Sequence, residues 1–214
     1  MTPLQIIFIV AAVLVVLLVV FIILYRPLKS HYTKKNFKDM YGKKIYKLAQ
    51  YHDFYLINEF LFAYEDNRAT TIDHILFGDK YIYLIKDCYY DGSLTGKLDD
   101  DNSLIKTTPK GKVSYVENPN NELKKNLDRL TRVLNMKSEL FICITLVNPE
   151  CIVEVSQNSK QFYLVQCNKA DRLVTAIETR AVSPIDEEQL HKFVQDLARY
   201  NKKGKRIARA KNNS

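Results

Sequence analysis

Two neighbouring segments of the chain carry side chains that could do chemistry together. The first contains Asp73 and His74, and the second contains Lys86, Asp87 and Cys88. Carboxylate oxygens can hold a divalent cation such as Mg²⁺, and a nearby lysine can orient or activate water. Asp73, Lys86 and Asp87 are therefore the candidate catalytic residues.

Both segments have the composition of β-strands. They are rich in branched and aromatic residues and are joined by a short Gly-Asp-Lys connection, which predicts a hairpin. The predicted strands are 70–77 and 81–88. Because side chains at alternate strand positions share a face, we expect Lys86 and Cys88 to share a face with Asp73. Asp87 is expected on the opposite face.

The stretch from residue 70 to residue 92 resembles the nuclease-related domain (NERD) family, a branch of the restriction-endonuclease-like fold. That family has an Ile-Asp-His strand, a short turn, a strand ending in Glu-x-Lys, and an Asn-Tyr-x-Gly turn. The matching residues are Ile72-Asp73-His74, Tyr90-Asp91-Gly92, Gly42 at the head of the first helix, and Asn118-Pro119 before the central helix. The resemblance covers about residues 42–180. It implies a restriction-endonuclease-like fold and a metal-binding role for Asp73, and many members carry an amino-terminal membrane helix.

The chain departs from the family pattern at its catalytic positions. Lys86 stands in the place of the family's Glu, and Cys88 in the place of its Lys. We expect Lys86 to form an ion pair with Asp73, which would compete with Mg²⁺ rather than bind it. This predicts no metal and no other cofactor. Cys88 is not expected to be a nucleophile, because the sequence places no His beside it.

Three alternatives remain open for these residues. Asp87 could supply a displaced carboxylate for Mg²⁺, which would require a bulge in the strand. The acids at 99–101 could serve instead, although three consecutive acids more often form a solvated loop. The motif could also align differently. An acid is common a few positions after the Gly of the first helix, and here Ile45 and Tyr46 occupy that region.

The elements that must position these residues alternate between helices and strands. Apolar spacing and capping signals indicate a mixed α/β domain around one sheet. The expected helices are 34–50, about 118–136, 169–179 and 184–200, and the expected strands, besides the hairpin, are 54–64, 139–147, 151–156, 161–166 and short, weakly specified strands in 93–117.

An uninterrupted apolar run of 20 residues, Ile6–Tyr25, precedes this domain. A helix of that length spans about 30 Å, the thickness of a bilayer core, which predicts a transmembrane anchor. A signal peptide fits less well because its apolar core is shorter and its start is charged. A buried core helix is the other alternative. Arg26 opens a segment, residues 26–50, with eight basic residues and Asp39 as its single acid, so residues 1–5 are expected outside and the domain in the cytoplasm.

The formal net charge of +8 is unevenly distributed along the chain. The basic segment after the anchor should contact anionic lipid. The division we expect is a juxtamembrane segment 26–41, a domain 42–200 and a disordered tail 201–214. The tail could bind lipid or nucleic acid or be a solvated end; its basic residues include Lys202, Lys203, Lys205, Arg206 and Arg209. The body between the basic segments is acidic, so the net charge by itself does not indicate a nucleic-acid binder.

Four cysteines with no paired spacing argue against a disulfide framework or a zinc site. The sequence as a whole favours a single-pass protein of the cell membrane whose NERD-like domain has lost catalysis. Such a domain would bind nucleic acid or an unidentified protein at the cytoplasmic membrane face. The alternatives are a divergent metal-dependent nuclease that uses Asp73 with a displaced second carboxylate, and a structural membrane protein that contacts only other proteins.

Overall fold

The structure is a computed structural model that describes residues 3–64, 68–99 and 102–212. Within these ranges the side chains of 4–11, 26–27, 30, 64, 68 and 202–212 also lie outside the description. The chain divides into an N-terminal unit, Met1–Met40, and a C-terminal unit, Tyr41–Ser214. Each unit is described separately below.

The N-terminal unit consists of helix. Helix α1, Pro3–His52, begins in this unit and carries one non-helical residue, Asn36, whose side-chain amide donates to the carbonyl of Tyr32 over 3.1 Å. The large apolar side chains from Val13 to Tyr25 are 45–66% exposed. Among residues with described side chains, no helix is both long and apolar enough to cross a membrane. The expected transmembrane helix 6–25 is therefore not found there, and its first side chains, 6–11, lie outside the description.

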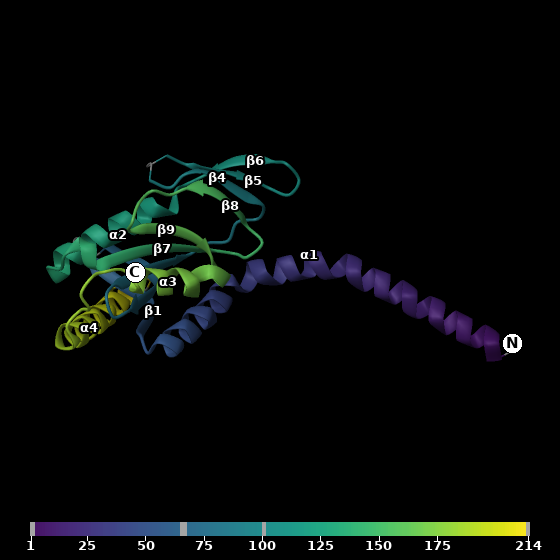
Figure 1. Ribbon diagram of the computed structural model, residues 1–214, viewed down its shortest axis with the longest axis horizontal. Coiled ribbons are helices and arrows are strands. Elements are labelled where there is room, and N and C mark those ends of the chain that lie inside the picture. Colours follow the sequence, from purple (N-terminus) through teal and green to yellow (C-terminus); the bar gives the residue numbers. More distant parts are fainter. Residues whose placement is uncertain (1–2, 65–67, 100–101, 213–214) are drawn as a thin grey trace. The chain divides into compact units, whose positions relative to one another are not determined.

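The C-terminal unit is built on a five-stranded sheet, sheet A, with the order β1-β2-β3-β7-β9. Its strands are β1 Tyr55–Tyr64, β2 Arg68–Phe77, β3 Ile82–Asp87, β7 Phe141–Val147 and β9 Phe162–Gln166. The expected hairpin is confirmed, because β2 and β3 pair antiparallel with His74 opposite Ile85 and Phe77 opposite Ile82. β3, β7 and β9 then run parallel to one another. This mixture of directions is the core of an α/β domain (Figure 1).

A second, four-stranded sheet, sheet B, has the order β6-β5-β4-β8. Its strands are β4 Ser93–Lys97, β5 Leu104–Thr107, β6 Val113–Val116 and β8 Ile152–Ser156. The expectation of one sheet is thus wrong. Gly92 has φ +102°, and a Cβ there would lie 2.0 Å from the carbonyl oxygen of Thr107, so glycine allows the sharp turn after β3 at which the chain leaves sheet A. Sheet B has its own small apolar cluster, which includes Leu94, Leu98 and Leu104.

Helices cover sheet A from both sides. The main core joins sheet residues such as Ile75 and Leu84 to Leu127 of α2, Pro119–Leu134, and Leu197 of α4, Glu187–Asn212. The expected start of α2 is confirmed, because Asn118 is the N-cap and its side chain accepts from the backbone N–H of Asn120. On the other side, a Cβ added to Gly42 of α1 would lie 3.5 Å from His74 Cε1. We call the two sides the α2 face and the α1 face.

The helix expected at about residues 169–179 is present to within one residue at each end, whereas the helix expected to start at 184 begins later. A 3₁₀ turn, η3 Cys167–Lys169, precedes α3, Ala170–Glu178, and its N-cap Lys169 makes no side-chain capping bond. α4 begins only at Glu187, with Asp186 Oδ1 accepting from the backbone N–H of Gln189 over 3.1 Å. α4 starts later than expected because the backbone N–H of Ile185 donates to the carbonyl of Asp79 over 2.7 Å. This bond holds the chain before α4 against the turn of the β2–β3 hairpin.

The remaining elements include another 3₁₀ turn, η2 Ser138–Leu140, just before β7. Helix α4 continues to Asn212 and so extends over the segment that we expected to be a disordered basic tail. Alanines, lysines and arginines favour helix there. The side chains of Lys202, Lys203, Lys205, Arg206 and Arg209 lie outside the described residues.

Candidate functional site

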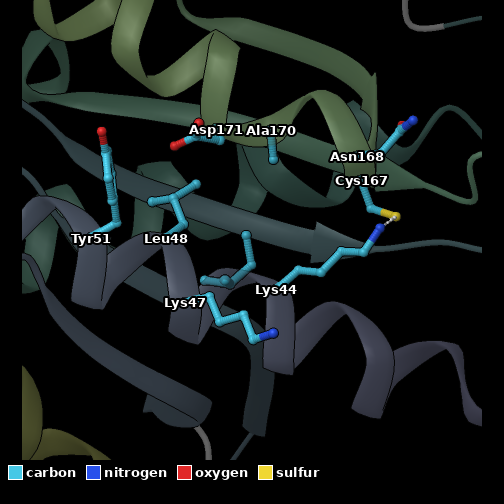
Figure 2. Close-up of a pocket in the computed structure, with 9 residues that line it drawn as sticks. Lys44, Lys47, Leu48, Tyr51, Cys167, Asn168, Ala170 and Asp171 are labelled. Carbon is cyan, nitrogen blue, oxygen red and sulfur yellow. Dashed lines mark hydrogen bonds between the residues drawn. The ribbon is translucent and has the colours of Figure 1, made fainter.

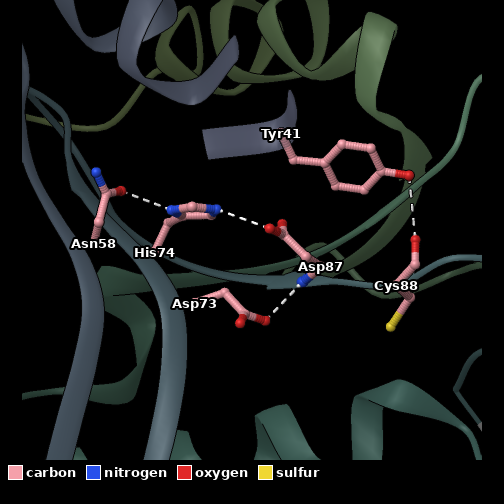
Figure 3. Close-up of polar contacts among 6 residues, drawn as sticks. All are labelled: Tyr41, Asn58, Asp73, His74, Asp87 and Cys88. Carbon is pink, nitrogen blue, oxygen red and sulfur yellow. Dashed lines mark hydrogen bonds and ion pairs between the residues drawn. The ribbon is translucent and has the colours of Figure 1, made fainter. Parts of the chain in front are cut away.

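The β2–β3 hairpin sorts the candidate residues onto two faces of sheet A. The register of His74 with Ile85 makes Asp73 and Lys86 the next cross-strand neighbours. Strand alternation puts Asp73, Lys86 and Cys88 on the α2 face and places His74 and Asp87 on the α1 face. Figure 3 shows this division: the carboxylates of Asp73 and Asp87 point to opposite sides of the strands.

On the α2 face, Lys86 is engaged by a residue that the sequence did not single out. Its ammonium forms an ion pair with the carboxylate of Glu122, which stands in the first turn of α2. The lysine stem is long enough to cross from the sheet to the helix. The short Asp73 side chain stays at the strand, where Oδ2 accepts from the backbone N–H of Asp87 over 2.9 Å. Lys86 thus has a partner on α2, Glu122, that we had not expected.

Cys88 completes the α2 face just beyond β3. Burial raises the pKa of its thiol to about 11, although the nearby charge of Lys86 partly opposes this effect. At neutral pH the sulfur is therefore a neutral thiol. The Tyr41 hydroxyl of α1 donates to the backbone carbonyl of Cys88 over 3.3 Å. Burial raises the pKa of the Tyr41 phenol well above its usual range.

On the α1 face, His74 and Asp87 form a buried pair. His74 Nε2 lies 3.0 Å from Asp87 Oδ2, and His74 Nδ1 lies 2.7 Å from Asn58 Oδ1 (Figure 3). His74 is 5% exposed and Asp87 is 6% exposed. The sequence contained a signal for this pair. Strand alternation places Asp87 on the inner side of the sheet, and a buried acid needs a polar partner; we had used alternation only to separate Asp87 from Asp73.

A sequence model of one family matches the part of the chain that carries these residues. It is the nuclease-related domain, NERD, and it matches residues 38–149, which is more than half of the chain. The chain belongs to the NERD family. A comparison with curated proteins gives no match. Among solved structures there is a similarity to a chain titled "Crystal Structure of Protein of Unknown Function AF1548". It has 15% identity and a TM-score of 0.30, and the alignment covers 80% of this chain and 96% of that chain.

In this NERD domain the α2 face holds the ammonium group of Lys86 beside the candidate metal ligand Asp73. Mg²⁺ requires near-octahedral oxygen ligands, whereas the face presents the Asp73 carboxylate beside an ammonium and a neutral thiol. Glu122 could add oxygen ligands only by giving up Lys86. Among the residues that the structure describes, no group of three or more His, Cys, Asp or Glu side chains could hold a metal ion.

The other candidate residues of this NERD chain lie apart from that face. Asp99 holds a loop, because its carboxylate accepts from the backbone N–H groups of Asn158 and Ser159 over 2.7 and 3.2 Å. Its neighbours 100 and 101 are outside the described residues. Of the anchor residues, Tyr25 is 51% exposed, and the side chains of Ile6 and Arg26 lie outside the description.

Proposed function

We propose that this chain is a membrane-associated NERD protein whose nuclease-related face contacts nucleic acid without cutting it. The main observation in support of a loss of cleavage is the Lys86–Glu122 ion pair on the α2 face. Lys86 stands where the family has its metal-binding Glu, and the carboxylate of Glu122 neutralises the charge of Lys86.

Two further features support this proposal. Cys88 replaces the lysine that would orient the attacking water, and a neutral thiol whose pKa is about 11 supplies no positive charge at pH 7. Two basic residues of α2, Lys125 and Arg132, are exposed. Such residues can contact phosphates without reading sequence.

A nuclease assay tests the loss of cleavage. The full chain in neutral detergent is incubated with single- and double-stranded DNA and RNA and with Mg²⁺ or Mn²⁺. We expect no cleavage above the level of the Asp73→Ala variant. Binding measured in parallel should weaken as salt rises, because phosphate contacts release counterions.

The matched control is Asp79→Ala, since Asp79 is an exposed acid in the turn of the same hairpin. Metal-dependent cleavage that survives in this control and disappears in Asp73→Ala would overturn the proposal. Absence of any salt-dependent binding would leave a domain that contacts only proteins.

A second candidate function is a divergent nuclease that uses Asp73 together with Glu122. The favouring observation is that Glu122 lies in the first turn of α2, close enough to bond a side chain of the Asp73 face. Asp87 is less suitable because its carboxylate lies on the α1 face with His74. If this second candidate is right, Glu122→Gln abolishes cleavage whereas Asp87→Asn, in the fraction that folds, retains it.

Association with a membrane is the other part of the proposal. Its support is the apolar run 6–25, the basic segment that follows it, and the exposure of apolar side chains between Val13 and Tyr25. A monomeric soluble protein rarely exposes a continuous apolar surface of this kind. We propose that lipid covers this surface, that anionic headgroups contact the basic segment, and that the NERD domain lies in the cytoplasm.

A further inference from the structure

A cavity of about 390 Å³ lies on the α1 side of the C-terminal unit, away from the Asp73 face. It runs along two turns of α1 and is bounded opposite by η3 and the start of α3 (Figure 2). Its volume is within the usual range of small-ligand sites. The residues around it are Lys44, Ile45, Lys47, Leu48, Tyr51, Cys167, Asn168, Ala170 and Asp171.

One end of this cavity holds a lysine with a weak partner. Lys44 Nζ donates to Cys167 Sγ over 3.4 Å, and a sulfur atom is a poor acceptor for an ammonium group. Burial raises the pKa of the Cys167 thiol, although Lys44 opposes the shift. The sulfur is therefore neutral at pH 7, and the charge of Lys44 is not balanced by this contact.

Other groups along the cavity also favour an anion. Lys47 lines the cavity three residues further along α1, a spacing that places two side chains on the same helix face. Asn168 and Ala170 stand at the start of α3, where backbone N–H groups and the helix dipole favour negative charge. The N-cap Lys169 supplies no side-chain acceptor to these N–H groups.

Among the residues that line the cavity the acid is Asp171, which lies toward the opposite end; Glu150 and Asp87 do not line it, although both lie near enough to Cys167 to raise the pKa of its thiol. Figure 2 shows Asp171 on the side of Tyr51, whereas Lys44 and Cys167 form the other end. Asp171 Oδ1 is bonded to His52 Nε2 at 3.0 Å, so its charge is engaged by the histidine. Between the two ends, Ile45, Leu48 and Ala170 provide an apolar wall.

We propose that this cavity binds a phosphate ester, with the phosphate group between Lys44 and Lys47 and an adjoining apolar portion against Leu48. A phosphate monoester carries about −1.5 to −2 charges at pH 7, which matches two ammonium groups better than a carboxylate does. The phosphate could come from a soluble ester or from the headgroup of an anionic lipid.

The test is a titration of the full chain in neutral detergent with inorganic phosphate and, in a separate arm, with phosphatidic acid added to the micelles. Phosphatidylcholine at the same mole fraction is the zwitterionic reference. Binding is measured from ³¹P line widths and from the shift in thermal unfolding. Binding of inorganic phosphate supports a soluble ester, and binding of phosphatidic acid alone supports a lipid headgroup.

The variants are Lys44→Gln and Lys47→Gln, and Lys43→Gln is the matched control because Lys43 is exposed on the same helix and does not line the cavity. We expect the dissociation constant to rise about tenfold or more in each variant, about 1.4 kcal/mol, and to stay unchanged in the control. Lys44→Arg should retain most of the binding.

Absence of binding in both arms would overturn the proposal, and so would an equal loss in Lys43→Gln. If Lys44→Gln unfolds, as judged by circular dichroism, the exposed Lys47 still decides the question. The Asp73→Ala variant should bind phosphate normally, so a failure here is separable from a failure of the proposed nuclease-related function.

Discussion

The β2–β3 hairpin contributes to two polar pairs on opposite faces of the same sheet, His74 with Asp87 and Lys86 with Glu122, and their surroundings differ. His74 and Asp87 are almost fully buried. The side chains of Lys86 and Glu122 are 22% and 48% exposed. Removing one partner of a buried pair leaves an uncompensated polar group, whereas a partly exposed partner is solvated by water. The two pairs should therefore contribute differently to stability.

We expect His74→Ala to lower the free energy of unfolding by about 3–5 kcal/mol, the usual effect of breaking a buried pair. Lys86→Met should change it by less than about 1 kcal/mol, because solvent screens that pair. Denaturant unfolding of the full chain, followed by tyrosine fluorescence, measures both. Equal effects of the two substitutions would show that the His74–Asp87 pair is not the structural centre of the hairpin.

Cys88 gives a pH-dependent prediction. Only the thiolate reacts with iodoacetamide, and burial raises the pKa of this thiol to about 11. Its alkylation should therefore be slow at pH 8 and rise about tenfold per pH unit until the pH approaches that pKa. At pH 8 we expect the rate to be more than about a hundredfold below that of an unperturbed cysteine of pKa about 8.5.

Peptide mass spectrometry measures the alkylation of Cys88 separately from that of Cys143, Cys151 and Cys167. The same cysteine in the urea-unfolded chain is the control, since unfolding removes the burial that raises the pKa. A folded-state rate at pH 8 equal to the unfolded one would mean that burial does not raise the pKa of Cys88, which would reopen a nucleophilic role.

At the scale of elements, local signals were reliable wherever the chemistry itself was local. The hairpin followed from alternation and a Gly-Asp-Lys connection, and Asn118-Pro119 marked the start of α2 because both preferences act within one turn. The start of α4 could not be obtained this way. The sequence predicts a start at 184, but the backbone of Ile185 bonds to that of Asp79 and the helix starts at Glu187; such a long-range bond leaves no local pattern.

The same distinction applies to the candidate site. Alternation correctly separated Asp73 from Asp87, because it is a property of one strand. The partner of Lys86 could not be found from the hairpin, since Glu122 lies 36 residues later and reaches the sheet only through the packing of α2. The second sheet was missed for a similar reason: β4 pairs with β8, and a parallel pairing across a long interval has no sequence spacing to reveal it.

At the scale of the whole molecule, charge and hydropathy are segregated along the chain. Apolar residues are concentrated in 6–25, basic residues in 26–50 and beyond 199, and the body between the basic segments is acidic. An acidic body would be repelled by an anionic bilayer, so attraction to lipid must come from the apolar and basic segments. The apolar segment should contribute a salt-independent part of the affinity for the membrane, and the basic segments a salt-dependent part.

Liposome flotation of the full chain separates these two contributions. We expect the protein to float with vesicles at both low and high salt. Leu17→Glu combined with Phe21→Glu should abolish flotation at high salt, because the exposed apolar surface of the N-terminal unit then carries charge that lipid does not accept. Replacing Lys34 and Lys35 by Gln should weaken binding only at low salt and only with anionic vesicles, by about 1 kcal/mol per lysine. Flotation of the glutamate variant at an undiminished level would place the lipid contact elsewhere and would remove the basis for a membrane-associated NERD domain.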